Sequence, residues 1–373
     1  MAIAVVKIGS VVLAPRGTLD RGAVARLARE VLEAESDGWR IVVVSSGAIA
    51  CGLGPMGLRE APARIMDRQA AAAVGQQRLM AAWSEAFDAA GGRTVAQVLL
   101  TSDDIEHRAR FLNARHTIER LLRAGVTPIT NENDSVSFDE IRVGDNDRLG
   151  SLVAVAVGAD RLVMLSSVDG LQDRTGRVVE TITQMADARA LIRRDTSPTG
   201  VGGMATKLDA AEIARENGVG CVIAPGGRPG ALRAALRGEP VGTMIPAVGA
   251  GGRAARKRWI GYSIRARGEI HIDAGAVAAL RERGASLLPS GIVAVTGEFE
   301  QGAVVELVGP DQTVVARGLA SYAAGDLRRI AGRRAEEISG ALGYSYCDEA
   351  VHRDDLVLIG GHTGASDERE GTR

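Results

Sequence analysis

Cysteines, aromatic residues and net charge are all scarce in this chain of 373 residues. Cys51, Cys221 and Cys347 form no C-x-x-C pair, so the sequence predicts neither a disulfide framework nor a zinc site. Aromatic residues make up 3% and the formal net charge is −1. So little excess charge and so few stacking side chains are not typical of a protein that binds nucleic acid or an anionic membrane with its whole surface.

No apolar run approaches the 18 or so residues that a membrane-spanning helix needs. The first residues, MAIAVVKIGSVVL, are apolar, but Lys7 interrupts them and no basic segment precedes them. This pattern predicts a strand rather than a signal peptide, and we therefore expect a cytoplasmic protein. The sequence also lacks GxxxxGK[ST], the phosphate-binding loop of many kinases.

Hydrophobic residues make up 46% of the chain, and its length exceeds what one core usually supports. Within residues 1–250, nearly continuous apolar runs alternate with amphipathic ones. The runs predict strands at 3–10, 40–47, 95–100, 126–130, 161–166 and 219–224, and helices at about 20–38, 62–90, 109–124, 149–159 and 204–217. This alternation predicts an α/β fold, a mainly parallel sheet covered by helices on both faces.

The composition and the apolar pattern of the sequence change after residue 250. Residues 251–266 are basic and glycine-rich and predict a linker, and residues 267–358 predict a small β-rich domain. Its expected elements are strands near 268–272, 291–299, 303–308 and 313–320, and helices near 274–283 and 324–331. Residues 359–373 have little apolar content and are expected to be disordered.

Polar segments follow several of the predicted strands, at the carboxyl ends where α/β sheets bind ligands. They are KIGS (7–10), SSGAIA (45–50) and the start of TNENDSVSFDEIRVGDNDR (130–148). The last segment gathers asparagines and carboxylates at 131–134 and 145–147. Such donors and acceptors suit an amino acid, and carboxylates suit Mg²⁺. The alternative is a solvated loop in which Asn146 or Asp147 caps the next helix.

Two lysines stand in unusual places. Lys7 lies within an apolar strand, where a charge must be paired or functional, although it could also reach solvent at the strand end. Lys207 follows GVGGMA (200–205) in the first turn of a predicted helix, a place that favours anions. The alternative there is a glycine-rich turn with a surface lysine. GLGPMG (52–57) matches the GxGxxG pattern of dinucleotide-binding sites but starts several residues after its strand, so we do not expect it to bind a dinucleotide. Lysines, glycines and carboxylates together favour phosphoryl transfer.

At this point the motifs resemble those of a known family. VVKIGSVVL, VSSGAIACG, AAVGQQRLM, RFLNARHTI, TNENDSV, VGDNDRLGSLVA and GGMATK resemble, in order, the glutamate 5-kinases of the amino acid kinase family. GEIHIDAGAVAALRERGASLLPSGIVAVTGEFEQGAVV resembles the PUA domain of bacterial members, so the resemblance covers about residues 3–358. It implies the amino acid kinase fold, followed by a PUA domain.

The resemblance also implies an activity. ATP, with Mg²⁺, would phosphorylate the γ-carboxylate of L-glutamate to L-glutamyl 5-phosphate, the first step of proline biosynthesis. L-proline would inhibit the enzyme, glutamyl phosphate reductase would use its product, and the protein would be a homo-oligomer, either a dimer or a tetramer.

The resemblance further implies roles for particular residues. Lys7 and Lys207 would neutralise charge on the transferring phosphoryl group, and Asp147 would orient both. Glutamate would contact Ser46, Gly47, Asn131, Asp134, Asp145 and Asn146. ATP would contact Lys7, Gly9, Ser166, Ser167, Val201, Gly202, Gly203, Met204, Ala205, Thr206 and Lys207. The residues that hold the metal are not identified. No strong base is needed, because a γ-carboxylate is already ionised near pH 7.

Two departures from the family pattern concern the ATP site. Ser166 and Ser167 stand where Thr-Asp is frequent, and Val201 stands where threonine is common. They leave individual ATP contacts open.

Two alternatives remain open. One is a related kinase of the same fold that acts on aspartate, acetylglutamate or carbamate. The other is an RNA-binding protein with an inert kinase-like half, which the basic residues Arg256, Lys257, Arg258, Arg328, Arg329, Arg333 and Arg334 would permit. Because the net charge is near zero and aromatic residues are few, we expect a regulatory or assembly role for the C-terminal domain rather than RNA binding.

Overall fold

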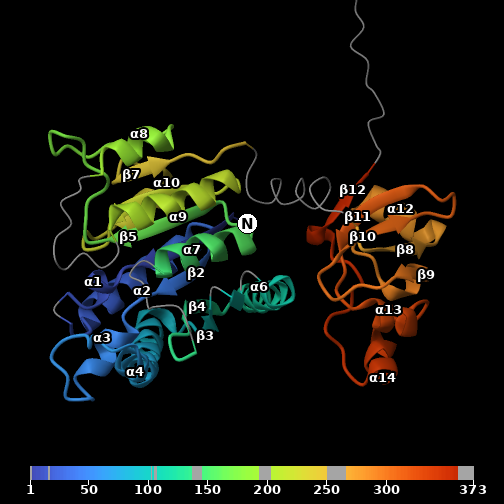
Figure 1. Ribbon diagram of the computed structural model, residues 1–373, viewed down its shortest axis with the longest axis horizontal. Coiled ribbons are helices and arrows are strands. Elements are labelled where there is room, and N and C mark those ends of the chain that lie inside the picture. Colours follow the sequence, from blue (N-terminus) through green and yellow to red (C-terminus); the bar gives the residue numbers. More distant parts are fainter. Residues whose placement is uncertain are drawn as a thin grey trace, which may run out of the picture. The chain divides into compact units, whose positions relative to one another are not determined.

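The computed structural model describes residues 2–15, 17–101, 103–104, 107–136, 145–192, 203–249 and 266–359. The chain divides into two compact units, Met1–Ala255 and Arg256–Arg373 (Figure 1). Residues 251–265 of the predicted linker and 360–373 of the predicted tail lie outside the described residues. Each unit is therefore described by itself. Within the described residues, no helix has the length and apolar character needed to cross a membrane.

The N-terminal unit is built on a seven-stranded sheet with the order β3-β4-β2-β1-β5-β6-β7. The strands are β1 (Ala2–Ile8), β2 (Trp39–Ser45), β3 (Val95–Leu100), β4 (Thr127–Glu132), β5 (Arg161–Ser166), β6 (Gly220–Pro225) and β7 (Thr243–Ile245). Every pairing is parallel except that of β6 with β7. All six predicted strands are present. The edge strand β7 was not predicted, because three residues carry too little pattern to be recognised.

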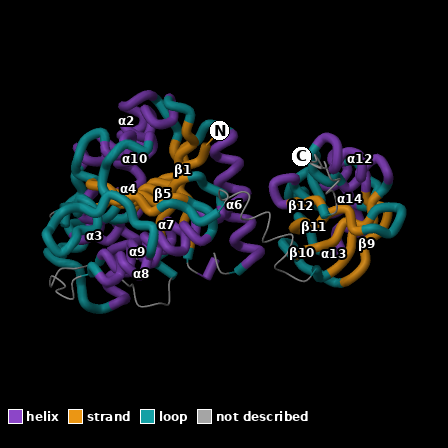
Figure 2. Tube along the Cα trace, turned by 90° about the horizontal axis from the view of Figure 1, so that it is seen from above, coloured by secondary structure: helices purple, strands orange, loops and turns teal. Residues whose placement is uncertain are grey.

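Helices cover both faces of this sheet. They are α1 (Ser10–Leu13), α2 (Arg21–Ser36), α3 (Ala48–Leu53), α4 (Ile65–Gly91), α6 (Arg108–Arg123), α7 (Asp145–Ala156), α8 (Met185–Ala190), α9 (Met204–Glu216) and α10 (Ala231–Arg237). Figure 2 shows the strands between α2 and α10 on one side and α8 and α9 on the other. The fold class predicted from the sequence is confirmed.

The alternation of side chains along β1 assigns its residues to the two faces. Ala4, Val6 and Ile8 join the core beneath α2, α4 and α10, whereas Ile3 and Val5 join the core beneath α7 and α9. Lys7 continues the second series and therefore faces α7 and α9. Since β1 has β2 on one side and β5 on the other, the chain changes direction here, which is where doubly wound sheets bind ligands.

The helix α7 begins at Asp145, four residues before the predicted start. The sequence pattern missed this turn because residues 145–148, DNDR, are all polar, whereas the apolar periodicity starts at Leu149. Acidic residues are favoured in the first turn of a helix, where they meet its positive end. The extra turn brings residues 145–147 into a fixed helical geometry.

Two glycines bring α3 and α4 into backbone contact. A Cβ atom on Gly52 would lie 1.9 Å from the carbonyl oxygen of Ala71, and one on Gly75 would lie 1.8 Å from the carbonyl oxygen of Ala48. Neither position has room for a side chain. Gly52, the first glycine of the GLGPMG segment, is therefore required for helix packing.

The C-terminal unit holds a five-stranded sheet with the order β12-β11-β10-β8-β9. Its strands are β8 (Gly268–Ile272), β9 (Ile292–Gly297), β10 (Val304–Val308), β11 (Val314–Leu319) and β12 (Leu356–Leu358), and its helices are α12 (Ala274–Arg283), α13 (Ala324–Ile330) and α14 (Ile338–Leu342). The pair β8–β10 is parallel and the others are antiparallel. The four predicted strands and two predicted helices are present, and the short elements β12 and α14 were not predicted.

Candidate active site

Lys7 is the second-last residue of β1 and is only 6% exposed. Its Nζ lies 2.5 Å from Oδ1 of Asp147 in α7. Gly150, one turn further along α7, makes room for the lysine, because a Cβ atom there would lie 3.2 Å from Cβ of Lys7. The alternative in which Lys7 extends to solvent at the strand end is therefore wrong.

Lys207 reaches the same carboxylate from α9. This helix begins at Met204 with Gly203 as its N-cap, so Lys207 lies in the first turn. The residue is 6% exposed, and its Nζ lies 3.0 Å from Oδ2 of Asp147. The hydroxyl of Thr206 lies 3.0 Å from the same Oδ2. The alternative of an ordinary surface lysine is therefore wrong for Lys207.

Asp147 is fully buried between the two ammonium groups. Burial raises its pKa, but the charges of Lys7 and Lys207 outweigh this effect and hold the pKa below the usual value. Burial lowers the pKa of Lys7; the carboxylate of Asp147 opposes this shift and the charge of Lys207 adds to it, leaving a lowered pKa. The two lysines and one carboxylate carry one net positive charge in a buried place. This arrangement attracts an anion such as a phosphoryl group.

Three of the residues proposed for glutamate lie at the carboxyl ends of the neighbouring strands β2 and β4. Ser46 and Gly47 follow β2; Ser46 is 8% exposed, and its backbone N–H donates to the carbonyl of Ile8 at 3.2 Å. Gly47 caps α3 with a φ of 108°, a conformation that favours glycine. Asn131 lies at the end of β4 and is almost fully buried. The structure therefore brings these residues to one edge of the sheet.

The other three residues proposed for glutamate come from the acidic segment. Asp134 is half-buried in the turn after β4, and Asp145 and Asn146 open α7, although the side chain of Asp145 lies outside the described part of the structure. Oδ1 of Asn146 is buried without a hydrogen-bond partner among the described residues. A buried acceptor without a donor is destabilising, so this atom is a candidate acceptor for an N–H group of a ligand.

The residues proposed for ATP lie at the ends of β1 and β5 and at the start of α9. The N–H of Gly9 donates to the carbonyl of Leu165 at 3.0 Å, and a Cβ atom on Gly9 would lie 3.9 Å from Nζ of Lys7. Ser166 ends β5 and is buried, whereas Ser167 is exposed. Gly203 is the N-cap of α9, and Met204, Ala205 and Thr206 lie with Lys207 in its first turn, whereas Val201 and Gly202 lie outside the described residues. Their roles towards ATP stay predictions.

Two residues beside this edge, Gln76 and Arg26, were not predicted from the sequence. The amide of Gln76 in α4 accepts a hydrogen bond from Nδ2 of Asn131 at 2.8 Å. Arg26 in α2 donates to Glu30 at 2.8 Å and to the carbonyl of Gly226, after β6, at 2.6 Å. A polar residue on the buried side of an alanine-rich helix is the signal that would have pointed to Gln76.

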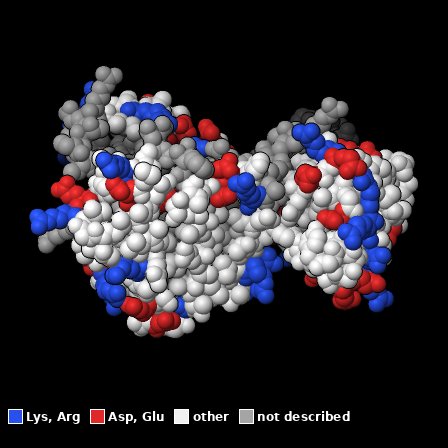
Figure 3. All heavy atoms as spheres, turned by 60° about the horizontal axis from the view of Figure 1, so that its bottom comes forward, with Lys and Arg blue, Asp and Glu red and all other residues white. Residues whose placement is uncertain are grey.

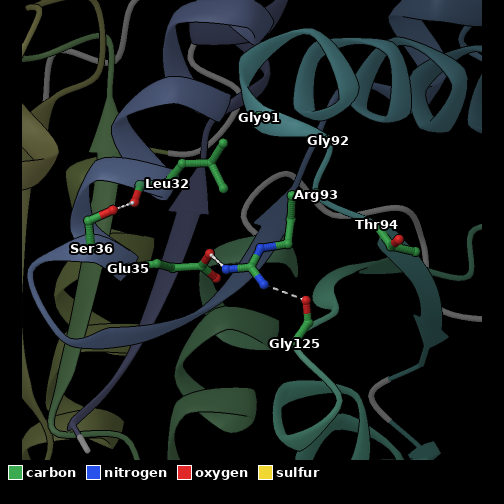
Figure 4. Close-up of a pocket in the computed structure, with 8 residues that line it drawn as sticks. All are labelled: Leu32, Glu35, Ser36, Gly91, Gly92, Arg93, Thr94 and Gly125. Carbon is green, nitrogen blue, oxygen red and sulfur yellow. Dashed lines mark hydrogen bonds and ion pairs between the residues drawn. The ribbon is translucent and has the colours of Figure 1, made fainter.

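A surface hollow of about 380 Å³ lies at the opposite edge of the sheet, around the ends of α2 and α4 (Figure 4). Arg93 crosses it and donates to Glu35 and to the carbonyl of Gly125, both at 2.5 Å. The charged side chains of the hollow, Arg93 and Glu35, are thus paired with each other. We assign this hollow a structural role and no ligand.

The arginines proposed for RNA in the C-terminal unit make internal contacts. Arg328 donates to Glu298 at 2.8 Å, Arg329 donates to the carbonyl of Ala341, and Nε of Arg333 donates to the carbonyl of Arg329 at 3.0 Å. On the face drawn in Figure 3, basic side chains lie beside acidic ones. The proposed residues 256–258 lie outside the described part of the chain.

Comparison with known proteins identifies the family. The model of the amino acid kinase family matches residues 2–225, and the model of the PUA domain matches residues 268–342. The glutamate 5-kinase of Myxococcus xanthus (strain DK1622) is 49% identical over 363 residues, which cover 95% of this chain and 96% of that protein. The chain belongs to the glutamate 5-kinases of the amino acid kinase family. The glutamate 5-kinase of Anaeromyxobacter dehalogenans (strain 2CP-C) is 48% identical, and the match again covers 95% of this chain and 96% of that protein.

Among solved structures, a carbamate kinase from Giardia lamblia bound to AMP-PNP is 19% identical, with a TM-score of 0.49, and the match covers 66% of this chain and 99% of that chain. The two family matches confirm the predicted family. They also confirm the predicted order, an amino acid kinase fold followed by a PUA domain.

Proposed function

We propose that this protein transfers the γ-phosphoryl group of ATP to the γ-carboxylate of L-glutamate, giving ADP and L-glutamyl 5-phosphate. The observation that carries the proposal is the buried contact of Lys7 and Lys207 with Asp147 at the carboxyl edge of the sheet. Relatives named glutamate 5-kinase that are 43–49% identical over 95% of the chain support the choice of substrate.

In the proposed reaction, a γ-carboxylate oxygen forms a bond to the γ-phosphorus of ATP. The bond from that phosphorus to the oxygen bridging the β-phosphorus breaks, and ADP leaves with the electron pair. No proton is transferred, because the attacking carboxylate is already ionised. Lys7 and Lys207 stabilise the charge on the transferring phosphoryl oxygens, and Asp147 holds both ammonium groups in place.

Mg²⁺ would enter with ATP as part of the substrate, since this ion is usually held by one or two carboxylates together with substrate phosphates. Both oxygens of Asp147 already contact ammonium groups. The backbone N–H groups in the first turn of α9 lack intrahelical acceptors, and the same turn carries Thr206 and Lys207, whose side chains contact Asp147. We assign the phosphates of ATP to this turn and to Gly9.

For glutamate we propose Ser46, Gly47, Asn131, Asp134, Asp145 and Asn146. Oδ1 of Asn146, which has no partner in the part of the chain that the structure describes, would accept from the α-ammonium group. We further propose that residues 1–250 form the kinase domain, 251–266 a linker and 267–358 the PUA domain.

The family resemblance leads us to expect proline inhibition, a dimer or tetramer, delivery of the labile acyl phosphate to glutamyl phosphate reductase, and a cytoplasmic location, where both substrates are found.

The test is ADP release with ATP and Mg²⁺ on L-glutamate, L-aspartate and N-acetyl-L-glutamate, each with and without L-proline. We expect turnover on glutamate alone and its suppression by proline. Turnover on another acid instead would contradict the proposed substrate, and turnover on glutamate that proline leaves unchanged would contradict only the inhibition.

Two variants separate the roles of the residues. Lys207→Ala should lower kcat by about 10²–10³-fold, because its contact strengthens in the transition state. Asp134→Ala should mainly raise the KM for glutamate. An unchanged kcat in the first variant, or an effect confined to the KM for ATP in the second, would contradict the assignments.

A further inference from the structure

Gln76 is a polar residue of α4 that the proposed mechanism does not use. Its neighbour Gly75 packs so tightly that a Cβ atom there would lie 1.8 Å from the carbonyl oxygen of Ala48, in the first turn of α3. Gln76 therefore lies beside the loop of Ser46 and Gly47, which leads from β2 into α3. On its other side it contacts Asn131 at the end of β4. It thus stands between two segments assigned to glutamate.

A chain of hydrogen bonds fixes which end of the Gln76 amide faces which way. The backbone N–H of Glu132 donates to Oδ1 of Asn131 at 2.9 Å. Since a backbone N–H can only donate, Oδ1 must be the end of the Asn131 amide that lies there. Nδ2 of Asn131 is then the end that reaches Gln76, and it donates to Oε1 at 2.8 Å. Nε2 of Gln76 is left as the free end of the chain.

Nε2 of Gln76 is buried and has no hydrogen-bond partner among the described residues. An amide nitrogen can only donate, so the missing partner must be an acceptor. Buried polar groups in native proteins are nearly always paired, and an exception at the edge of a binding site indicates a ligand atom. Among the groups of an amino acid substrate, only carboxylate oxygens accept hydrogen bonds.

We propose that Gln76 binds the α-carboxylate of the substrate through Nε2, held in orientation by Asn131. This inference rests on the proposed function. The choice between the two carboxylates follows from strand order: β4, with Asn131, is separated from β1, with Lys7, by β2. Two strand spacings amount to about 10 Å. The γ-carboxylate must meet the phosphoryl group at Lys7, so the α-carboxylate is the end that lies toward Gln76.

The decisive variant is Gln76→Glu, because it keeps an acceptor for Asn131 and replaces the donor with a carboxylate oxygen. The test compares kcat/KM for L-glutamate with kcat/KM for its α-amide, L-isoglutamine, which keeps the γ-carboxylate. We expect the preference for glutamate over the α-amide to fall by roughly 10- to 100-fold, the range for losing a hydrogen bond to a charged group. The kcat/KM for the α-amide should rise relative to that for glutamate, because the N–H of the α-amide can donate to the introduced carboxylate. The KM for ATP should stay within about twofold.

The neighbouring residue offers a matched control. Gln77 is on the same helix but is exposed, so Gln77→Glu introduces the same charge without entering the site and should leave the preference unchanged. Gln76→Met removes both hydrogen-bonding ends at similar volume. It should raise the KM for glutamate without favouring the α-amide, and it serves as the test if Gln76→Glu does not fold.

If kcat/KM fell equally for L-glutamate and L-isoglutamine in Gln76→Glu, Gln76 would only support Asn131. That result would overturn the inference and leave the proposed function intact. A wild-type protein that does not act on glutamate would overturn both.

Discussion

Replacing Asp147 by asparagine tests the centre of the site with the smallest change of shape. The substitution keeps the volume of the side chain and removes the carboxylate that both Lys7 and Lys207 contact, at 2.5 Å and 3.0 Å. Both lysines are 6% exposed, so water cannot replace the lost charge. The folded protein then holds two buried ammonium groups without that countercharge, and the free energy of unfolding must fall.

The size of the effect follows from known buried ion pairs. Removing one partner of such a pair costs about 3–5 kcal/mol. In a domain of roughly 250 residues, 1 kcal/mol lowers Tm by about 2–4 °C, so we expect Asp147→Asn to unfold roughly 6–20 °C lower. We also expect kcat to fall by about 10²–10³-fold, because the lysines are no longer held against the transferring phosphoryl group.

Thermal unfolding followed by circular dichroism, and ADP release at saturating substrates, measure the two effects. Asp209→Asn is the control, because Asp209 is an exposed residue of α9 paired with Arg189 at 2.7 Å, and such surface pairs are worth about 0–1 kcal/mol. The reasoning is refuted if Asp147→Asn unfolds within about 2 °C of the wild type and keeps its kcat within about threefold.

Three further predictions concern neighbouring features. Because the pKa of Lys7 is lowered, kcat/KM for ATP should decline as the pH rises, starting at a pH below that at which an ordinary lysine loses its proton. In Lys7→Arg this decline should move to higher pH, since arginine stays charged. Gly75→Ala should lower the free energy of unfolding in urea by about 1–3 kcal/mol, whereas Gly54→Ala, with open space around it, should not. Arg26→Ala should raise the KM for ATP severalfold and leave the KM for glutamate unchanged, because Gly226, whose backbone N–H donates to the carbonyl of Ser166 in the proposed ATP site at 2.7 Å, loses its anchor; equal changes in both constants would contradict this.

Much of the fold could be predicted because buried parallel strands are nearly continuous apolar runs, as in residues 40–47 and 161–166. The two three-residue strands, β7 and β12, could not, since so short a run carries no periodicity. The first turn of α7 was missed because the polar residues 145–148 interrupt the apolar pattern, although they suit the positive end of a helix.

The candidate site was only partly predictable for a different reason. A lysine within an apolar strand indicates that Lys7 has a partner but does not say which, because Asp147 is brought to it by tertiary packing. The role given to Asp147 came from the family resemblance. The importance of Gln76 depends on which way the Asn131 amide faces, and that is set by a hydrogen bond between residues that lie together only in the fold.

The most direct measurement of the central claim is to trap the product. With ATP, Mg²⁺, L-glutamate and hydroxylamine, an acyl phosphate at the γ-carboxylate is converted to the γ-hydroxamate, which can be quantified beside ADP. We predict that hydroxamate forms in step with ADP, and that both are lost together in Lys207→Ala. ADP release without hydroxamate would show that the phosphoryl group goes to water or to another acceptor, and would contradict transfer to the γ-carboxylate of glutamate.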